Sequence, residues 1–359
     1  MLYQYNHRSW WRSHFFWIGL VVVVLVVIGI VFSVTISLVD TSKNTHHVSP
    51  IVTAPAPRDW SSFFAKTVVG AKAAYVVDLG TGQTLYSKNA SEPLPLASLT
   101  KLMTTATALD LAPTTTIVAI THLAVIEGWG GDSGLYVDER WRLSDLLKFT
   151  LVVSSNDGAT AIAQNVGAML RNPNAIAQQL HFRTASSTAL VVPNAANLVW
   201  SASTTDLESD QALFVEKMNE LAGKLGLTSA HFYDPSGLDM STTTAGGYAS
   251  AQDVAKLLIY DATRYPTILG ATRYPTITIS SLNNLRHVGN NTDVLSLSGL
   301  NLIASKTGYT DLAGGNLAII TLIANHPVVI VVLGSTIPGR FQDVAALAST
   351  SATVIAAGG

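Results

Sequence analysis

The first hydrophobic feature along the chain is an apolar segment over residues 15–39, twenty-five positions without a charge. About 20 apolar residues suffice for a helix to cross a bilayer, and the segment is longer than the apolar centre of a cleaved signal peptide. Arg8 and Arg12 precede it, so the positive-inside rule predicts a cytoplasmic tail over 1–14, a transmembrane helix over 15–39 and an extracytoplasmic remainder. Residues 40–59, rich in Pro, Ser and Thr, predict an unstructured linker. We therefore expect a single-pass protein of the cell membrane.

Beyond the linker, residues 60–359 show strand patterns at both ends and helical spacing between them. Two apolar runs around Gly80 and Gly82 predict a β-hairpin over 73–90, and two β-branched runs predict a second hairpin over 314–336. Apolar positions three and four apart predict helices over 97–112, 144–153, 157–170, 211–227, 250–262 and 340–357. This order favours one domain, with a single sheet assembled from both ends of the chain and a helical layer inserted.

Two stretches interrupt the pattern. Residues 171–210 lack a clear period and are rich in Ser, Thr, Ala and Asn, which predicts a surface insertion. The heptapeptide ATRYPTI occurs at 262–268 and again at 271–277. Two copies are too few for a repeat architecture, so we interpret them as a local duplication or a coincidence.

Composition narrows the functional classes. The formal net charge of −2 gives no electrostatic reason to expect nucleic acid as a partner. The absence of Cys excludes disulfides, thiolate metal ligands and a cysteine nucleophile. The nine His residues show no metal-ligand spacing, so we expect neither a metal site nor another cofactor.

One short pattern pairs a serine with a lysine. Ser98 and Lys101 stand three residues apart at the start of a predicted helix, so the amine can reach the hydroxyl. The helix N-terminus adds backbone N–H groups that favour developing negative charge. A lysine acts as a base only when burial or a nearby cation lowers its pKa, and Lys306 is a candidate for that cation.

Two further patterns follow in order. Ser154 and Asn156 lie in the break between two predicted helices, where polar side chains can point into a cleft. The run from Lys306 to Gly308 precedes the second hairpin, where a glycine lets a substrate backbone lie close to a strand edge. Each pattern alone is weak, but the three together, in this order and setting, form a strong signal for a serine acyl-transfer site.

A fourth pattern, Gly-Asp-Ser-Gly around Ser133, would mark the nucleophile in a chymotrypsin-like protease. Such a protease needs His, Asp and Ser separated by long stretches of two β-barrels. His122 lies only eleven residues before Ser133, and no series of barrel strands surrounds it. We therefore interpret the glycine-rich run around Ser133 as a loop.

With their flanking residues, the three motifs resemble the serine-type D-Ala-D-Ala carboxypeptidases, the low-molecular-mass penicillin-binding proteins. The likeness is carried by DLGTGQTLYSKNASEPLPLASLTKLMT, LLKFTLVVSSNDGATAIA, FVEKMNELAGKLGLTSAHFYDPSGLD and NNTDVLSLSGLNLIASKTGYTDLAGGNLA. It covers most of 73–335 outside the insertion. The resemblance implies an α/β fold of the β-lactamase/transpeptidase type, an antiparallel sheet flanked by helices plus an all-helical subdomain, here preceded by one transmembrane helix.

The resemblance also implies a role for each motif residue. Ser98 would be the acylated nucleophile, Lys101 its general base and Ser154 the relay that protonates the departing D-alanine. The oxyanion hole would come from the backbone N–H groups of Ser98 and Tyr309. The substrate would be held by Asn156 at its amide, by Lys306 and Thr307 at its carboxylate, and along the strand by Gly308 and Tyr309.

Two departures from the family pattern stand out. Some members have an arginine that assists carboxylate binding where this chain has Gln252, which puts the strength of carboxylate recognition in doubt. The sequence ends soon after its closing helix, so we expect the protein to lack the extra β-rich C-terminal domain of several members and the N-terminal span to replace that domain's membrane-binding helix.

The expected activity is removal of the terminal D-alanine from peptidoglycan stem pentapeptides, with β-lactam antibiotics as inhibitors. Three alternatives stay open. The same motifs serve DD-endopeptidases, which cut cross-bridges. They also serve β-lactamases, although no counterpart of the deacylating Glu-containing loop is evident. A non-catalytic, membrane-tethered peptidoglycan-binding protein is the third.

Overall fold

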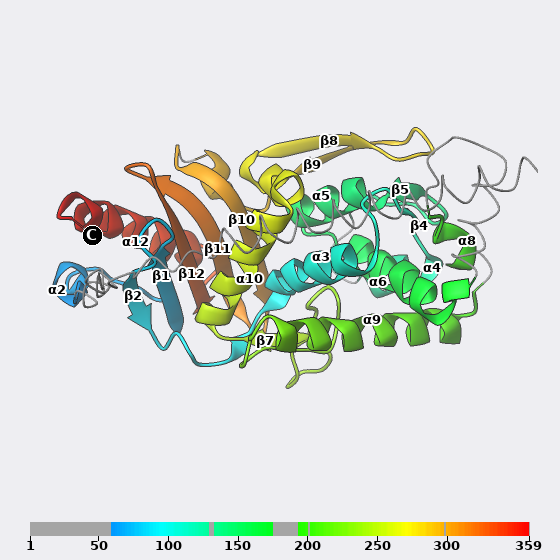
Figure 1. Cartoon of the computed structure of the whole chain (residues 1–359), viewed down its shortest axis with the longest axis horizontal. Helices are drawn as coiled ribbons and strands as arrows, with labels where there is room; N and C mark the ends of the chain where they lie inside the picture. The colour runs from blue at the N-terminus through cyan, green and yellow to red at the C-terminus, as the bar shows by residue number, and fades with distance from the viewer. Residues whose placement is uncertain (1–58, 129–132, 175–192, 200–201, 298, 359) are drawn as a thin grey trace, which may run out of the picture. The chain divides into compact units, whose positions relative to one another are not determined.

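The computed structural model describes residues 59–128, 133–174, 193–199, 202–297 and 299–358. A five-stranded antiparallel sheet has the strand order β10-β11-β12-β1-β2 (Figure 1). Both predicted hairpins are confirmed, because β1 (Ala73–Asp78) pairs with β2 (Thr84–Lys88) and β11 (Gly314–Ile323) pairs with β12 (His326–Ser335). β12 also pairs with β1, so both ends of the domain build one sheet, as predicted. β10 (Asn301–Thr310) forms an edge.

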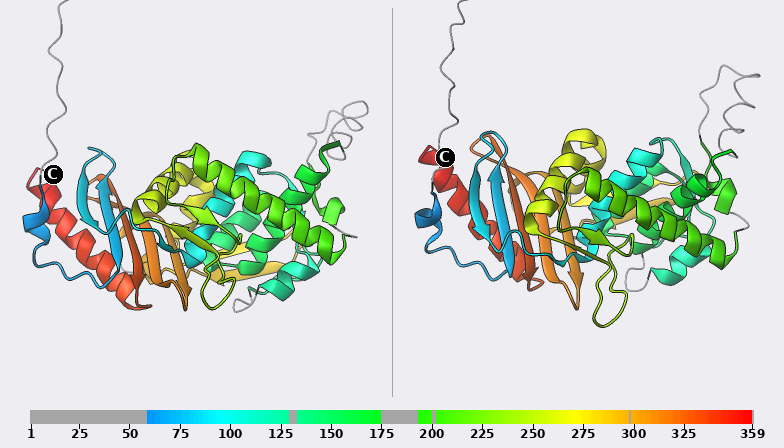
Figure 2. Two further views of the ribbon diagram at one scale, coloured as in Figure 1. Left: turned by 90° about the horizontal axis from the view of Figure 1, so that it is seen from below. Right: turned by 60° about the horizontal axis from the view of Figure 1, so that its bottom comes forward.

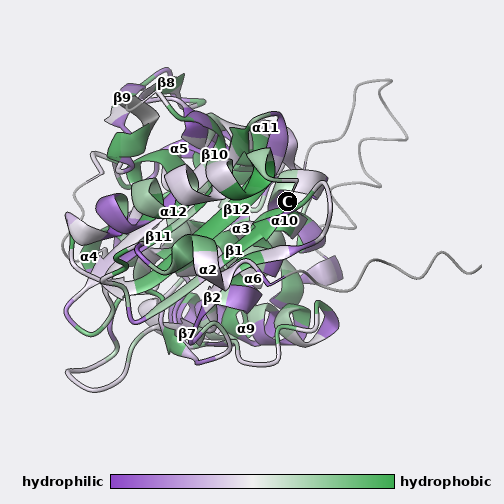
Figure 3. Cartoon of the chain, turned by 90° about the vertical axis from the view of Figure 1, so that its left-hand side faces the viewer, coloured by the Kyte–Doolittle hydropathy of each residue, from purple (hydrophilic) through white to green (hydrophobic). Residues whose placement is uncertain are grey.

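The central strands are buried on both faces, which explains their nearly continuous apolar runs. Side chains alternate along β12, so Ile330 and Val332 pack in a cluster with α12 (Gly339–Ala356) and α2 (Ser61–Phe64). Val329 and Val331 lie in the larger core with the other helices. Figure 3 shows the hydrophobic character concentrated on these strands, between the two helical layers.

The remaining helices cover the face of the sheet opposite to α12 and α2, and they extend beyond the sheet (Figure 2). The helices predicted from sequence periodicity are confirmed as α3 (Thr100–Leu111), α5 (Leu143–Val153), α6 (Asn156–Arg171), α9 (Thr204–Lys224), α10 (Ala251–Arg264) and α12. Shorter helical segments are α4 (His122–Glu127), α8 (Ala196–Val199), α11 (Pro266–Leu269), and the 3-10 turns η1 (Ala97–Leu99), η2 (Gly270–Arg273) and η3 (Val294–Leu297). α6 is buried along most of its length and forms the centre of the helical part.

Short strands that the sequence patterns did not indicate form three small sheets. They are β3 (Leu94–Pro95), β7 (Gly247–Ala249) and β6 (His231–Phe232); β4 (Ile117–Ala119) and β5 (Arg140–Arg142); β8 (Thr276–Ser280) and β9 (Arg286–Asn290).

The expected surface insertion over 171–210 is wrong at its C-terminal end, because residues 204–210 are the first turns of α9. A capping box starts this helix: the Ser203 side chain accepts from the Asp206 backbone, and the Asp206 side chain accepts from the Ser203 backbone. The buried Asp210 accepts two hydrogen bonds from Arg171 at the end of α6, at 2.6 and 2.9 Å. The capping box and this ion pair stabilise the first turns of α9, whose sequence has little apolar periodicity.

The two ATRYPTI copies adopt different structures. The first ends α10 and begins α11, whereas the second runs from η2 into β8. Tertiary context therefore decides the conformation of this heptapeptide.

Among the described residues, no helix has the length and apolar character needed to cross a membrane. The segment 15–39, for which the sequence predicts such a helix, lies outside them.

Candidate active site

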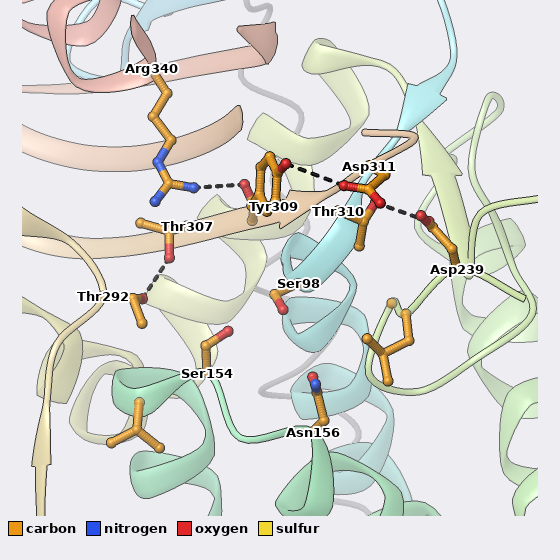
Figure 4. A pocket seen from close by; sticks show the side chains of 14 residues that line it. Ser98, Ser154, Asn156, Asp239, Thr292, Thr307, Tyr309, Thr310, Asp311 and Arg340 are labelled. Atoms are coloured by element: carbon orange, nitrogen blue, oxygen red, sulfur yellow. Dashed lines mark hydrogen bonds between the residues drawn. The ribbon is translucent and has the colours of Figure 1, made fainter. Parts of the chain in front are cut away.

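The three sequence motifs meet at one pocket of about 540 Å³ (Figure 4). Its walls come from η1 just before α3, the break between α5 and α6, the loop over 237–239, the segment after β9, strand β10 and the start of α12. Ser98, Ser154, Asn156, Thr307, Gly308 and Tyr309 all line it. Lys101 and Lys306 lie behind this wall and are buried.

Ser98 lies on a turn that other segments approach closely. Ala97, just before it, has a left-handed backbone with φ of 50°, an uncommon conformation for a residue with a side chain. A Cβ added to Gly308 on β10 would lie 2.7 Å from the Leu96 carbonyl oxygen, and one on Gly237 would lie 2.0 Å from the Ala97 carbonyl oxygen. Gly308 is therefore needed for the close contact between β10 and the turn that carries Ser98. The sequence analysis had explained this glycine by the close approach of a substrate backbone instead.

Lys101 is fully buried and its amine has three partners. Nζ lies 2.8 Å from Ser98 Oγ, 2.7 Å from Asn156 Oδ1 and 2.7 Å from the carbonyl oxygen of Ser236. The carbonyl oxygen of Ser236 and the amide oxygen of Asn156 can each accept a hydrogen bond but cannot donate one. A neutral amine has two hydrogens for these two acceptors, which leaves its lone pair for the hydroxyl of Ser98.

Burial lowers the pKa of Lys101 to about 7, and the negative charges of Asp234 and Asp157 oppose this shift. The predicted helper cation, Lys306, is not the main cause. At neutral pH a substantial fraction of Lys101 is therefore unprotonated and able to accept a proton.

The loop that follows β6 was missed by the sequence analysis as part of the site. Asp234 Oδ1 accepts hydrogen bonds from the backbone N–H groups of Ser236 and Gly237, both at 2.8 Å. This turn directs the Ser236 carbonyl toward Lys101. The sequence Asp-Pro-Ser-Gly, which begins at Asp234, is typical of such an Asx turn, so the turn could have been predicted from the sequence.

Ser154 and Asn156 lie at the predicted break between two helices. Ser154 ends α5 in a left-handed conformation with φ of 63°, which turns the chain toward the start of α6. Lys306 Nζ donates to Ser154 Oγ at 2.9 Å and to the carbonyl oxygen of Thr307 at 3.0 Å. Burial, with the charges of Lys101 and Arg340, holds the pKa of Lys306 well below its ordinary value.

Arg340, in the first turn of α12, is a pocket residue that the sequence analysis missed. Its side chain is buried, and Nη1 donates to the carbonyl oxygen of Gly308 at 2.8 Å. Its Nε has no hydrogen-bond partner among the described residues. The expectation that Gln252 occupies a carboxylate-binding position is wrong, because Gln252 lies on α10 next to Ala90 and is absent from the pocket wall. A buried arginine reaches the site from a different helix instead.

Ser133 lies outside the pocket wall, in agreement with its interpretation as a loop residue. Its hydroxyl lies 2.7 Å from the hydroxyl of Ser155, the N-cap of α6, and 2.9 Å from Asp157 Oδ2. Ser133 therefore fastens its loop to the start of α6.

The comparisons with known proteins agree with this geometry. The family model described as D-alanyl-D-alanine carboxypeptidase matches residues 62–186 and 201–336. A D-alanyl-D-alanine endopeptidase from Pseudomonas aeruginosa is 27% identical over 263 residues, which cover 72% of this chain and 70% of the relative. A D-alanyl-D-alanine carboxypeptidase from Escherichia coli is 28% identical over 280 residues, covering 74% of this chain and 57% of the relative.

Solved structures support the fold. A DD-transpeptidase from Streptomyces matches with a TM-score of 0.61 at 22% identity, covering 79% of this chain and 97% of that chain. A penicillin-binding protein from Listeria monocytogenes, in its ampicillin-bound form, matches with a TM-score of 0.56 at 23% identity, covering 79% and 97%. These matches confirm the β-lactamase/transpeptidase-type arrangement of antiparallel sheet and helices. Because the family model matches more than half of the chain, the chain belongs to the D-alanyl-D-alanine carboxypeptidase family of serine DD-peptidases.

Proposed function

We propose that this protein is a DD-carboxypeptidase that removes the terminal D-alanine from peptidoglycan stem pentapeptides through an acyl-enzyme on Ser98. The observation that carries the proposal is the 2.8 Å contact between Ser98 Oγ and the fully buried amine of Lys101, whose pKa is lowered to about 7. A serine hydroxyl beside a neutral amine is an activated nucleophile.

The reaction balances with the groups in the pocket. Lys101 takes the proton of Ser98 as Oγ attacks the carbonyl of the penultimate D-alanine, and the backbone N–H groups of Ser98 and Tyr309 stabilise the oxyanion. Ser154, held by Lys306 at 2.9 Å, relays this proton from Lys101 to the amine of the departing D-alanine, so Lys101 is neutral again and Ser154 keeps its hydroxyl. Water then hydrolyses the ester and restores the hydroxyl of Ser98.

The substrate's terminal carboxylate is assigned to the cationic end of the pocket. Thr307 and Arg340 line this end, and the buried Lys306 lies behind it. Asn156 both binds Lys101 and lines the pocket, where its amide is available to the substrate backbone.

Labelling with fluorescent penicillin, followed by mapping of the modified peptide, tests the nucleophile. We expect the label on Ser98, its loss in Ser98→Ala and its retention in Ser133→Ala, the matched control from the other serine motif. Labelling that survives in Ser98→Ala and disappears in Ser133→Ala would overturn the assignment.

A DD-endopeptidase that cuts peptidoglycan cross-bridges is the second candidate. It is favoured by the likeness to the endopeptidase from Pseudomonas aeruginosa and to one from Escherichia coli that is 25% identical over 268 residues. Product analysis on a stem pentapeptide and on a cross-linked dimer separates the two activities. Faster release of D-alanine from the pentapeptide supports the carboxypeptidase, and faster cleavage of the dimer supports the endopeptidase.

We further propose that residues 15–39 anchor the enzyme in the cell membrane with the peptidase domain outside. The apolar run and the preceding arginines support this topology. Protease added to intact spheroplasts should degrade the domain beyond residue 39, whereas a protected domain would contradict the orientation.

A further inference from the structure

A cluster of aromatic side chains lies outside the pocket wall, on the small sheet of β3, β7 and β6. His231 on β6 lies opposite Tyr248 on β7, and Tyr233 follows two residues after His231. The ring centroids of His231 and Tyr233 lie 4.5 Å apart, and those of Tyr233 and Tyr248 lie 6.4 Å apart, both edge to face. We call these three rings the aromatic face.

The aromatic face is open to solvent, whereas the other side of the same strand is packed. Tyr233 is 47% exposed and His231 is exposed, while Phe232, which lies between them in the sequence, is buried. The rings therefore contact one another without being covered by the rest of the described chain. Contiguous exposed rings of this kind mark an interaction surface.

The chain connects the aromatic face directly to the active site. β3 leads into the turn that carries Ser98. Tyr233 lies three residues before Ser236, whose carbonyl oxygen lies 2.7 Å from Lys101 Nζ. Three extended residues span at most about 11 Å, so the aromatic face begins within that distance of a group in the site.

The composition around the aromatic face indicates the class of ligand. Residues 226–250 contain no Lys or Arg, so nothing there would attract an anionic polymer or an anionic membrane. The loop between β6 and β7 instead carries four consecutive hydroxyl side chains, at 241–244. A sugar ring has an apolar C–H face and a rim of neutral hydrogen-bonding groups, so exposed aromatic rings beside neutral hydroxyls fit a saccharide.

The proposed substrate carries such a saccharide. A stem peptide is joined through its N-terminus to a glycan of N-acetylated amino sugars, four residues from the scissile bond of a pentapeptide. Four extended residues span about 13 Å. This length matches the separation between the site and the aromatic face, so the sugar of a bound molecule can reach the rings.

We propose that His231, Tyr233 and Tyr248 form a saccharide-binding surface that holds the glycan while the attached stem peptide occupies the pocket. The inference rests on the proposed function, because that function supplies a glycan-linked peptide as substrate. Binding energy from a part of the substrate remote from the reacting bond raises kcat/KM. Glycan-linked peptides are therefore better substrates than the same peptides without sugar.

Two substrates with the same pentapeptide test the surface on the full-length chain. One carries the N-acetylated disaccharide on its N-terminus, and the other carries an acetyl group there, so both lack the N-terminal charge. We expect kcat/KM to be about tenfold higher for the glycan-linked substrate. The preference should not change with salt concentration, because the contact involves no charge.

Variants assign the preference to the rings. Tyr233→Ala should bring the ratio of the two kcat/KM values close to one, and Tyr233→Phe, which keeps the ring, should retain most of it. The ratio is the readout because damage to the fold lowers both values together. Tyr274→Ala is the matched control, since Tyr274 is 50% exposed beside β8, on the side of the molecule opposite to β7 in Figure 1, and it should keep the wild-type ratio.

Binding of glycan chains stripped of peptide tests the surface without the reaction, and we expect Tyr233→Ala to weaken it. Equal kcat/KM values for the two substrates in the wild type, a preference that survives Tyr233→Ala, or absence of glycan binding would overturn the saccharide-binding surface. None of these results would affect the proposed function. Absence of hydrolysis of both substrates would contradict the proposed function, and the glycan-binding measurement would still decide on the surface.

Discussion

At the scale of single residues, the charge on one buried amine decides whether Ser98 reacts. Burial lowers the pKa of Lys101 to about 7, and Asp234 partly reverses the shift. Because the neutral amine is the base, the rate of acylation by penicillin should fall about tenfold for each pH unit below 7 and level off above it.

Asp234→Asn should move the midpoint of this pH profile to lower pH, because the change removes a negative charge that raises the pKa of Lys101. The Oδ1 that accepts the hydrogen bonds of the turn is kept in the amide, so the loop is preserved. The measurement is the acylation rate constant with fluorescent penicillin across about pH 5–9. Asp110→Asn should leave the midpoint unchanged, and an upward shift in Asp234→Asn would contradict the account.

Arg340 is the residue to which we assign most of the carboxylate recognition. Charge-assisted hydrogen bonds contribute about 1.5–3 kcal/mol, so Arg340→Ala should lower kcat/KM for a D-Ala-D-Ala peptide by about tenfold to a hundredfold. Gln252→Ala, at the position that sequence comparison suggested, should keep the wild-type value because Gln252 is outside the pocket. If only Gln252→Ala lowered kcat/KM, the carboxylate would be bound at the position of Gln252 and not by Arg340.

At the scale of elements, the contact between β10 and the serine turn positions the site. A Cβ on Gly308 would lie 2.7 Å from the Leu96 carbonyl oxygen and 3.2 Å from the Ser98 nitrogen, and backbone atoms move less easily than side chains. Gly308→Ala should therefore displace Ser98 and reduce acylation by at least about tenfold. Gly270→Ala, where an added Cβ meets nothing within 4 Å, is the control and should retain labelling. Full acylation in Gly308→Ala would show that the turn can shift freely.

The predictability of elements from sequence follows the kind of signal each one carries. The helices and the two hairpins have strong apolar periods and were predicted. The same heptapeptide runs from α10 into α11 in its first copy and from η2 into β8 in its second, so no local rule can assign both. The run from Lys306 to Gly308 precedes the second hairpin, as predicted. The strand β10 in which it lies was not predicted, because its polar residues do not indicate a strand and its conformation depends on pairing with β11.

At the scale of the whole molecule, the site assembles residues that are far apart in the sequence. The order of motifs was sufficient to predict that Ser98, Ser154 and Lys306 converge. Arg340 carries no motif and reaches Gly308 only because α12 packs against the sheet, a long-range contact that periodicity does not encode. Residues with a local signature were therefore found, and residues placed by tertiary packing alone were not.

Buried groups that titrate also link the stability of the whole domain to pH. Asp261 on α10 is 0% exposed, and neither carboxylate oxygen has a hydrogen-bond partner among the described residues. Burial raises its pKa well above the ordinary value. The folded state therefore holds a proton that the unfolded chain releases, so this group's contribution to stability is fully present below the unfolded pKa. That contribution is lost as pH rises from the unfolded toward the folded pKa.

Asp261→Asn removes the ionisation and keeps the size of the side chain. At neutral pH the variant should have a higher free energy of unfolding, because keeping the wild-type carboxyl protonated costs about 1.4 kcal/mol for each pH unit above its unfolded pKa and an amide carries no such cost. The gain should shrink as pH falls toward the unfolded pKa, because the wild-type carboxyl is then protonated in both states. Urea unfolding across about pH 4.5–8 measures the difference, with Asp110→Asn as an exposed control. A gain that is constant with pH would show that packing, and not ionisation of Asp261, causes it.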